Sequence, residues 1–295
     1  MNSAKGTTIR GARNQAAERA AGRSTGRIAA TFARLQAARQ VGFVPFIMAG
    51  DPDLDATLEL LRIAADTGAD LIELGMPFAD PMADGPVLQR SAERALARGA
   101  TLPGILEVLG RFRRESLVPV ILFGYANPFL RYGVERLVRD AAQSGADGIL
   151  CVDMPPEEAD ELRIPAEATG LDMIFLLAPT SDLARVDRVA ACARGFVYFV
   201  SITGTTGAAA PVATEVAARV GTVRARTGLP VGVGFGISTP SQAVEIARIA
   251  DAVVVGSAIM RLVEDHSGEA LLPTVREFLS SMAAAVHAVE VPRHG

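Results

Sequence analysis

Residues 68–75, Gly-Ala-Asp-Leu-Ile-Glu-Leu-Gly, decide the fold because they join the end of a helix to a short buried strand. A similar Gly-Ala-Asp junction recurs at residues 145–147, and Gly170 and Gly228 take corresponding places. Glycine suits the left-handed position at which a helix stops. The repeat therefore predicts helix-to-strand turns that stabilise one end of a parallel sheet.

Short apolar runs alternate with amphipathic segments over most of the chain. Each run has the length and the continuous apolar character of a strand buried on both faces. Segments between the runs, such as 54–66, 134–143 and 242–250, have helical periodicity. Eight such pairs predict an α/β fold, a closed (β/α)8 TIM barrel, rather than an open sheet. The predicted strands are 43–49, 70–74, 118–123, 148–152, 172–177, 196–200, 230–233 and 252–255.

We expect one barrel domain, residues 27–290, preceded by a basic leader at residues 1–26. The leader has five basic residues against one acidic residue, a pattern found in disordered tails and, less often, in organelle transit peptides. A cytoplasmic protein is therefore expected, with organelle import as the minority alternative. Residues 26–40 predict an amphipathic helix that closes the lower end of the barrel. Its inward-facing residues are Ile28, Phe32 and Leu35.

The interval after the second predicted strand is enlarged. It holds the loop 76–86 and two helical segments, 87–97 and 102–115. Loops that follow strands form the active face of a TIM barrel. This insertion is therefore the first candidate for a functional segment.

Side-chain composition narrows the function classes. The 295-residue chain has a net charge of −4, which argues against a nucleic-acid surface, and no apolar run reaches the roughly 18 residues that cross a bilayer. Between residues 41 and 260 there is neither lysine nor histidine. We therefore expect no lysine imine, no imidazole-dependent nucleophile and no imidazole metal site. Acid–base chemistry is left to carboxylates or tyrosines.

Glu73 lies inside the second predicted strand, where its neighbours are apolar. A carboxylate there is costly unless it is paired, exposed at the strand end, or used in chemistry. Burial raises the pKa of such a carboxyl toward neutrality, which suits a group that gives and takes a proton. The alternative is a glutamate held in a salt bridge to an arginine at the rim.

The loop after this strand, residues 77–86, reads Pro-Phe-Ala-Asp-Pro-Met-Ala-Asp-Gly-Pro. Three prolines and a glycine restrict its backbone and present Asp80 and Asp84 near Glu73. A rigid loop that holds a carboxylate suits a hydrogen bond to a substrate N–H group. The alternative is an aspartate that caps the helix beginning near Pro86.

Glycine-rich turns follow the last three predicted strands, at residues 201–207, 234–238 and 256–257. Backbone N–H groups that are freed by glycine and placed at helix N-termini bind anions. TIM barrels often hold a phosphate after strands seven and eight. The three turns together predict a phosphorylated small-molecule substrate. Glycines needed only for tight turns are the alternative.

Four stretches resemble the tryptophan synthase alpha chain family in order and spacing. They are FVPFIMAGDP at 43–52, LIELGMPFADPMADGP at 71–86, VSITGTTG at 200–207 and GFGIS at 234–238. The resemblance runs from about residue 27 to the C-terminal helix. It implies a lyase of L-tryptophan biosynthesis that cleaves indole-3-glycerol phosphate to indole and D-glyceraldehyde 3-phosphate.

The resemblance also implies roles for individual residues. Glu73 would protonate C3 of the indole ring and remove the proton from the C3′ hydroxyl group, while Asp84 would accept a hydrogen bond from the indole N–H group. Tyr198 would orient Glu73, and Thr206 would bind the catalytic aspartate. The other implied substrate-binding residues are Gly207, Gly236, Gly256 and Ser257 at the phosphate, Phe46, Phe123 and Tyr125 around the ring, and Phe235.

A partner follows from the resemblance as well. Alpha chains of the family dock on a PLP-dependent beta subunit in an α2β2 complex. The PLP would belong to that partner, so no cofactor is expected in this chain. Residues 208–211, Ala-Ala-Ala-Pro, depart from many family members, so the resemblance does not carry over the family's details of loop closure, although it still implies the reaction. The implied contact residues are Phe78, Asp80, Pro81, Asn127 and Pro155.

Three other interpretations remain open. A stand-alone indole-glycerol-phosphate lyase would keep both carboxylates and differ in its activity without a beta subunit. A catalytically inactive barrel retained as an allosteric partner of a beta subunit would not need the carboxylates intact. Another phosphate-binding barrel, such as a phosphoribosyl isomerase, would explain the glycine turns but not Glu73 or the loop 76–86.

Overall fold

Eight parallel strands close into a barrel in the order in which they occur in the chain. The computed structural model describes residues 26–200, 210–234 and 236–290, so nearly all of the predicted leader lies outside the described residues. The closed parallel barrel confirms the predicted fold. The strands are β1 (Gly42–Met48), β2 (Ile72–Gly75), β3 (Val120–Gly124), β4 (Gly148–Cys151), β5 (Asp172–Leu177), β6 (Val197–Val200), β7 (Val231–Gly234) and β8 (Ala252–Val255).

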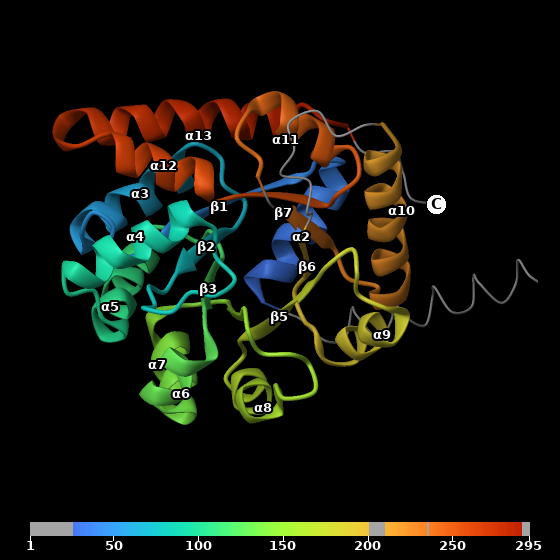
Figure 1. Cartoon of the computed structure of the whole chain (residues 1–295), viewed down its shortest axis with the longest axis horizontal. Coiled ribbons are helices and arrows are strands. Elements are labelled where there is room, and N and C mark those ends of the chain that lie inside the picture. The colour runs from blue at the N-terminus through green and yellow to red at the C-terminus, as the bar shows by residue number, and fades with distance from the viewer. Residues whose placement is uncertain (1–25, 201–209, 235, 291–295) are drawn as a thin grey trace, which may run out of the picture.

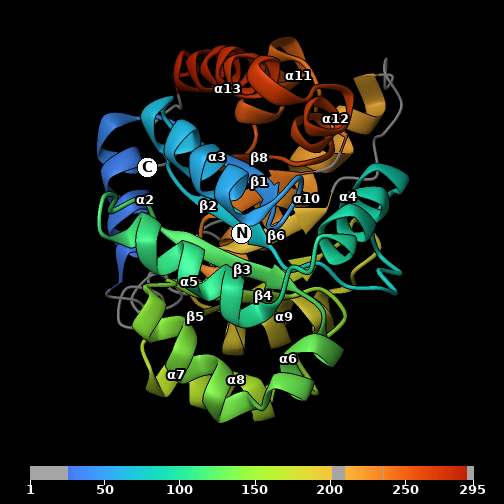
Figure 2. The ribbon, with the colours of Figure 1, turned by 90° about the vertical axis from the view of Figure 1, so that its left-hand side faces the viewer.

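Helices form the outer layer of the barrel. They are α2 (Arg27–Ala38), α3 (Leu54–Asp66), α4 (Pro86–Ala97), α5 (Leu102–Arg113), α6 (Ala126–Tyr132), α7 (Val134–Ser144), α8 (Asp160–Ala168), α9 (Leu183–Cys192), α10 (Ala210–Thr227), α11 (Pro240–Ala247), α12 (Ser257–Asp265), the 3-10 helix η1 (Gly268–Ala270) and α13 (Leu271–His287). In both views α11, α12 and α13 lie at the top of the picture and α6, α7 and α8 at the bottom, on opposite sides of the barrel (Figure 1 and Figure 2). In the described part of the chain, no helix has the length and apolar character needed to span a bilayer.

The enlarged interval after β2 is confirmed, because α4 and α5 both lie between β2 and β3. The predicted strand bounds agree with the observed ones to within two residues. The largest difference is at α11, which the sequence predicts at 242–250. The helix starts earlier because Thr239 caps it and Pro240 occupies its first turn, where a proline needs no N–H partner.

Three aspartates fasten the lower, N-terminal ends of neighbouring strands. The backbone N–H of Asp70 donates to the Phe43 carbonyl, and the Phe43 N–H donates back to the Asp70 carboxylate, both at 2.9 Å. The same reciprocal pairs join Asp147 to Val120 and Asp251 to Val231. These pairs give the repeated Gly-Ala-Asp sequence a structural role at the lower face. The predicted helix-stop glycines, Gly68, Gly145, Gly170 and Gly228, all have positive φ.

The helix α2 closes the lower end of the barrel, as predicted. Its inward residues, including Phe32, are buried among the side chains of the barrel interior, and the Phe32 and Phe196 ring centroids lie 5.7 Å apart. Arg34 of α2 pairs with Asp70 at 2.5 Å, which ties the helix to the strand ends. With its lower end filled, the barrel has its open mouth at the C-terminal ends of the strands.

Candidate active site

The Glu73 side chain points into the barrel. Leu71, two residues earlier, belongs to the interior cluster, and side chains along a strand alternate between faces. Glu73 is 1% exposed, and no group in the described part of the chain donates a hydrogen bond to its Oε1 atom. Burial raises the pKa of this carboxyl to about 8. Near neutral pH the group is therefore mostly a neutral acid.

The alternative of a rim salt bridge for Glu73 is wrong within the described residues. None of the ion pairs among them includes Glu73, although arginines pair with many other acids of the barrel. The aspartates at the lower strand ends, such as Asp147, take that structural role instead, because Arg27 and Arg113 both pair with Asp147. Glu73 is thus a buried carboxyl that no arginine of the described chain compensates.

Asp84 lies in the loop after β2, on the same face of the barrel. Partial burial raises the pKa of its carboxyl to about 6, and a hydrogen bond from Tyr125 opposes that rise. The Tyr125 hydroxyl also accepts a 3.1 Å hydrogen bond from the Ala83 N–H group. Tyr125 therefore fixes both the loop and its carboxylate. The cap alternative is wrong, because Gly85 is the N-cap of α4 and no side chain caps that helix end.

Tyr198 on β6 lies near both carboxyls. Burial raises the pKa of its hydroxyl well above the usual range, and the charges of Glu73 and Asp84 raise it further. The three groups therefore share one electrostatic environment. The Tyr198 hydroxyl lies over Gly234 of β7, where a Cβ atom would approach the hydroxyl oxygen to 2.2 Å. A glycine at 234 is thus required by the position of the tyrosine ring.

Phe46 of β1 and Phe123 of β3 form an aromatic wall beside these groups. Their rings meet edge to face with centroids 5.2 Å apart. The Phe46 ring also covers Gly75 of β2, where a Cβ atom would lie 2.4 Å from its Cζ atom. Gly256 lies on the other side of Phe46, at 3.3 Å by the same measure. Phe46 therefore links the Glu73 strand to the turn after β8.

Two features of this site are not predicted by the sequence. Tyr125 is predicted only as a ring-packing residue, whereas its hydroxyl binds the Asp84 loop and its ring centroid lies 5.4 Å from that of Phe78. Gly75 is the second feature. It follows Glu73 by two residues, so it shares the interior face, and this spacing is the signal that could have identified it.

The turn after β8 leads directly into α12. Gly256 is the N-cap of the helix, no side-chain cap is formed there, and Ser257 begins the first turn. The first N–H groups of an α-helix have no partner within the helix. This end of α12 is therefore suited to bind an anion.

The turn after β7 is organised differently. Thr239 and Gln242 form a capping box at the start of α11, and the Ser238 N–H group also donates to Gln242 Oε1 at 2.8 Å. Gly236 is exposed before this box and has a φ of 71°. Of the two turns, the one at Gly256 leads into the helix whose N-terminus has no side-chain cap. Thr206, Gly207 and Phe235 lie outside the described residues.

The residues predicted to contact a partner come from the segments that follow three adjacent strands on this face, and Asn127 lies in the first turn of α6. They are Phe78, Asp80 and Pro81 after β2, Asn127 after β3, and Pro155 after β4. Asp80 and Asn127 are exposed, and the other three are partly exposed. Met82, in the first of these segments, is 90% exposed. The segments that follow β2, β3 and β4 therefore form one accessible surface beside the mouth of the barrel.

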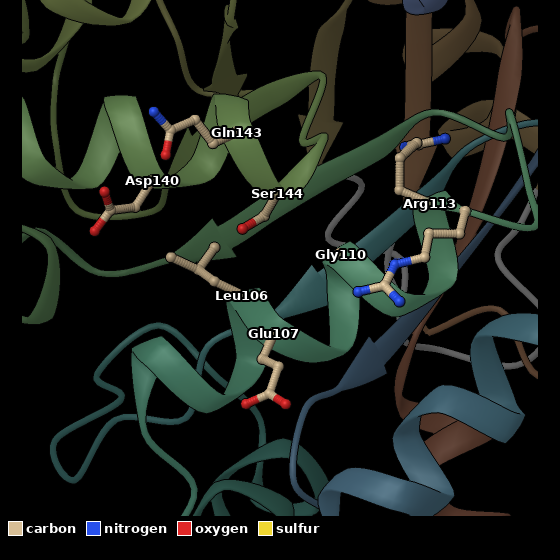
Figure 3. Close-up of a pocket in the computed structure, with 8 residues that line it drawn as sticks. Leu106, Glu107, Gly110, Arg113, Asp140, Gln143 and Ser144 are labelled. Atoms are coloured by element: carbon tan, nitrogen blue, oxygen red, sulfur yellow. The ribbon is translucent and has the colours of Figure 1, made fainter.

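A separate hollow of about 580 Å³ lies between α5 and α7 (Figure 3). Its lining residues are Leu106, Glu107, Gly110, Arg113, Arg114, Asp140, Gln143 and Ser144. Arg113 is already engaged there, since it pairs with Asp147 at 3.0 Å. The lining comes from the outer helices rather than from the C-terminal ends of strands. This hollow is therefore not the candidate active site.

The chain is similar in sequence to proteins of one family. The family model described as tryptophan synthase alpha chain matches residues 32–287. The tryptophan synthase alpha chain of Geobacter sulfurreducens is 52% identical over 260 residues, which cover 88% of this chain and 98% of that protein. The Burkholderia pseudomallei alpha chain is 47% identical over 267 residues, covering 90% of this chain and 98% of that one.

Solved structures give the same result. The tryptophan synthase subunit alpha of Legionella pneumophila matches with a TM-score of 0.83 and 38% identity, over 90% of this chain and 100% of that chain. A chain of Mycobacterium tuberculosis tryptophan synthase in its aminoacrylate-bound form matches with a TM-score of 0.80 and 32% identity, over 89% and 100% of the two chains. The chain belongs to the tryptophan synthase alpha chain family, an enzyme family of tryptophan biosynthesis.

Proposed function

We propose that the chain catalyses the retro-aldol cleavage of indole-3-glycerol phosphate to indole and D-glyceraldehyde 3-phosphate, a carbon–carbon lyase reaction. The observation that carries this proposal is the Glu73 carboxyl, which is buried inside a barrel of this family and has an oxygen without a partner in the described chain. A carboxyl held neutral near physiological pH is suited both to donate and to accept a proton.

Glu73 acts twice in the proposed reaction. It first donates its proton to C3 of the indole ring, which leaves the ring nitrogen as an iminium-type centre. The Glu73 carboxylate then takes the proton of the hydroxyl group on the neighbouring side-chain carbon while the bond from that carbon to ring C3 breaks. The bonding pair returns to the ring and the aldehyde leaves. One proton is given and one is taken back, so Glu73 ends the cycle protonated and the ring itself is the electron sink.

Asp84 supplies a negative charge for the iminium-type centre. In its ionised form it accepts a hydrogen bond from the ring N–H group and stabilises the positive charge that develops there. With pKa values of about 8 for Glu73 and about 6 for Asp84, the first carboxyl is an acid and the second an anion near neutral pH. Different environments thus give two carboxyls the two opposite roles that the reaction needs.

The remaining site residues bind the substrate in this proposal. The phosphate lies at Gly256 and Ser257, supported by the open N-terminus of α12, with Gly236 nearby. Phe46 and Phe123 contact the indole ring, and Tyr198 orients Glu73. Thr206 keeps its predicted role as a partner of the catalytic aspartate, and Gly207 and Phe235 keep theirs as further substrate contacts.

The chain is also proposed to dock on a beta subunit in an α2β2 complex. The exposed side chains of Asp80 and Met82 in the loop after β2, and of Asn127 in the first turn of α6, support a docking face beside the mouth. PLP would bind to the beta subunit, since the only lysine of this chain, Lys5, lies in the basic leader.

An indole-release assay with indole-3-glycerol phosphate tests the proposed function. The wild type is expected to release indole, and Glu73→Gln and Asp84→Asn are each expected to reduce the rate by about 10²- to 10⁴-fold. Wild-type protein that releases no indole, with or without a beta subunit, would refute the proposal. Steady-state rates with and without a beta subunit separate the two active forms: strong activation indicates a synthase subunit, and full activity alone indicates a stand-alone lyase.

A further inference from the structure

An ion-pair network ties α4 to the loop after β1 and to α12. The buried Asp51 carboxylate accepts hydrogen bonds from Arg94 at 2.7 and 3.0 Å and from the Ser91 hydroxyl at 2.6 Å. Arg94 also donates to Glu264 of α12 at 3.0 Å, and Arg90 binds the same glutamate through two nitrogens at 2.6 and 2.7 Å. Arg94 therefore joins all three elements.

The two helices carry opposite ends of the proposed substrate site. The helix α4 begins two residues after Asp84, and Gln89 in its first turn donates a 2.9 Å hydrogen bond to the Asp84 backbone carbonyl. The helix α12 begins at Ser257, next to the proposed phosphate site. A movement of α4 relative to α12 would therefore change the separation between the ring-binding carboxylate and the phosphate-binding turn.

The strand β1 and the loop after it contact both helices. The Met48 N–H group contacts Met260 Sδ of α12 at 3.4 Å. In the loop after β1, Gly50 approaches α4 so closely that a Cβ atom there would lie 3.3 Å from the Ala95 Cβ atom. Because β1 and the loop after it contact both helices at short range, the network acts between elements that are already packed.

We propose that this network is a spacer, and that Arg94 and Glu264 are positioning residues which fix the ring-to-phosphate length of the ligand that the site accepts. The inference rests on the proposed function, since it takes Asp84 as the ring contact and Gly256 with Ser257 as the phosphate contact. A ligand that spans both ends must match the spacing of the two helices. The affinity of a ligand that occupies one end alone does not depend on that spacing.

Glu264→Gln is the variant that tests the spacer without burying an unpaired charge. The Glu264 and Arg90 side chains are 23% and 49% exposed, so water can solvate the groups that lose a partner. Removing Arg94 would instead leave Asp51 buried without its guanidinium partner, which destabilises the fold itself. Glu115→Gln is the matched control, because Glu115 binds Arg62 of α3 through both oxygens at 2.5 and 2.8 Å, beside the lower end of β3.

The experiment is calorimetric titration of the full chain with three probes. Indole occupies the ring end, glycerol 3-phosphate occupies the phosphate end, and indole-3-propanol phosphate joins both ends in a molecule that cannot be cleaved. For Glu264→Gln we expect the affinity for the joined probe to fall about fivefold, the low end of coupling between sites. The affinity for each single-end probe should change less than about twofold, and Glu115→Gln should behave as the wild type.

Two results would overturn the spacer: Glu264→Gln that binds the joined probe as tightly as Glu115→Gln does, or single-end probes that weaken as much as the joined one. Binding is the readout, so the test does not depend on cleavage. A wild type that binds all three probes but releases no indole refutes the proposed function and still tests the spacer. A wild type that binds none of the probes overturns both.

Discussion

The two carboxyls at the barrel mouth differ in the state that the proposed reaction needs. Glu73 must begin protonated, and burial raises its pKa to about 8. Asp84 must be ionised, and its pKa, raised by burial and lowered by Tyr125, is about 6. At the scale of single residues, both groups are therefore in the required protonation state between about pH 6 and about pH 8.

This window predicts a bell-shaped pH dependence of kcat/KM for indole release. The rate should fall below about pH 6, as Asp84 gains a proton, and above about pH 8, as Glu73 loses one. Rate measurements across this range check the prediction. In Asp84→Asn the residual activity should lose the acidic limb and keep the basic one. A profile that is flat from pH 5 to pH 9 would contradict the assignment.

Tyr125→Phe tests the hydrogen bond that holds Asp84. That hydrogen bond lowers the pKa of Asp84, so its loss should raise the pKa and move the acidic limb to higher pH, by about one unit for a hydrogen bond to a charged group. The basic limb, which belongs to Glu73, should stay in place. The same rate measurements check this. Equal displacement of both limbs would indicate a general disturbance of the site instead.

Glu73→Gln is expected to stabilise the fold while it removes activity. Because the pKa of Glu73 is raised from 4.5 to about 8 on folding, the folded chain keeps a proton that the unfolded chain loses, and the free energy of unfolding falls as pH rises from 4.5 to 8. The glutamine variant lacks this loss and should gain up to about 3 kcal/mol at pH 7, and little near pH 4. Urea unfolding at both pH values measures it. A variant less stable than the wild type at pH 7 would count against a neutral, unpartnered Glu73.

At the scale of elements, the aspartates at the N-terminal ends of the strands contribute to stability, whereas the proposed chemistry takes place at the C-terminal ends. Asp70 accepts hydrogen bonds from Phe43 and Arg34 and contacts His287 of α13 at 2.8 Å. Burial disfavours its ionisation, but the hydrogen bonds outweigh burial and lower its pKa. Its stabilising contribution is therefore present above the unfolded pKa of about 3.8 and is lost as pH falls through the lower folded value.

Asp70→Asn should lower the free energy of unfolding by about 3 kcal/mol at neutral pH, since it breaks a buried ion-pair cluster. The difference from the wild type should shrink in acid. Urea unfolding checks both points, with Asp66→Asn as the control, because Asp66 is exposed and its partner Arg276 lies 3.5 Å away. Equal, small losses of unfolding free energy in the two variants would show that Asp70 does not stabilise the N-terminal ends of the strands.

The barrel elements were predictable because each carries a local signal. The apolar runs give the strands and the helix-stop glycines give the turns, whereas the start of α11 is decided by its Thr239 cap. Glu73 was identifiable from a charge in an apolar run. The Tyr125 hydrogen bond and the Asp51–Arg94 pair were not, because their partners lie 42 and 43 residues apart and the pairing depends on how separate loops pack.

At the scale of the whole molecule, the two ends of the barrel have different roles. The lower end is filled by α2 and fastened by Asp70, Asp147 and Asp251. The upper end holds the Glu73 carboxyl, which has no ion-pair partner among the described residues, glycines that leave room for Phe46 and Tyr198, and segments that are accessible to a partner. The rigidity of the first end allows the second to hold groups in states that cost stability.

Measuring the chemical step and substrate binding separately in Glu73→Gln shows whether the Glu73 carboxyl carries out the proton transfers. Single-turnover indole release is measured at saturating indole-3-glycerol phosphate, and the dissociation constant of the same substrate is measured for the same protein. If Glu73 moves the protons of the reaction, the rate should be at least about a hundredfold below that of the wild type, with a dissociation constant within about threefold of the wild-type value. Indole release near the wild-type rate, or a loss that is explained by weaker binding alone, would contradict this role of Glu73.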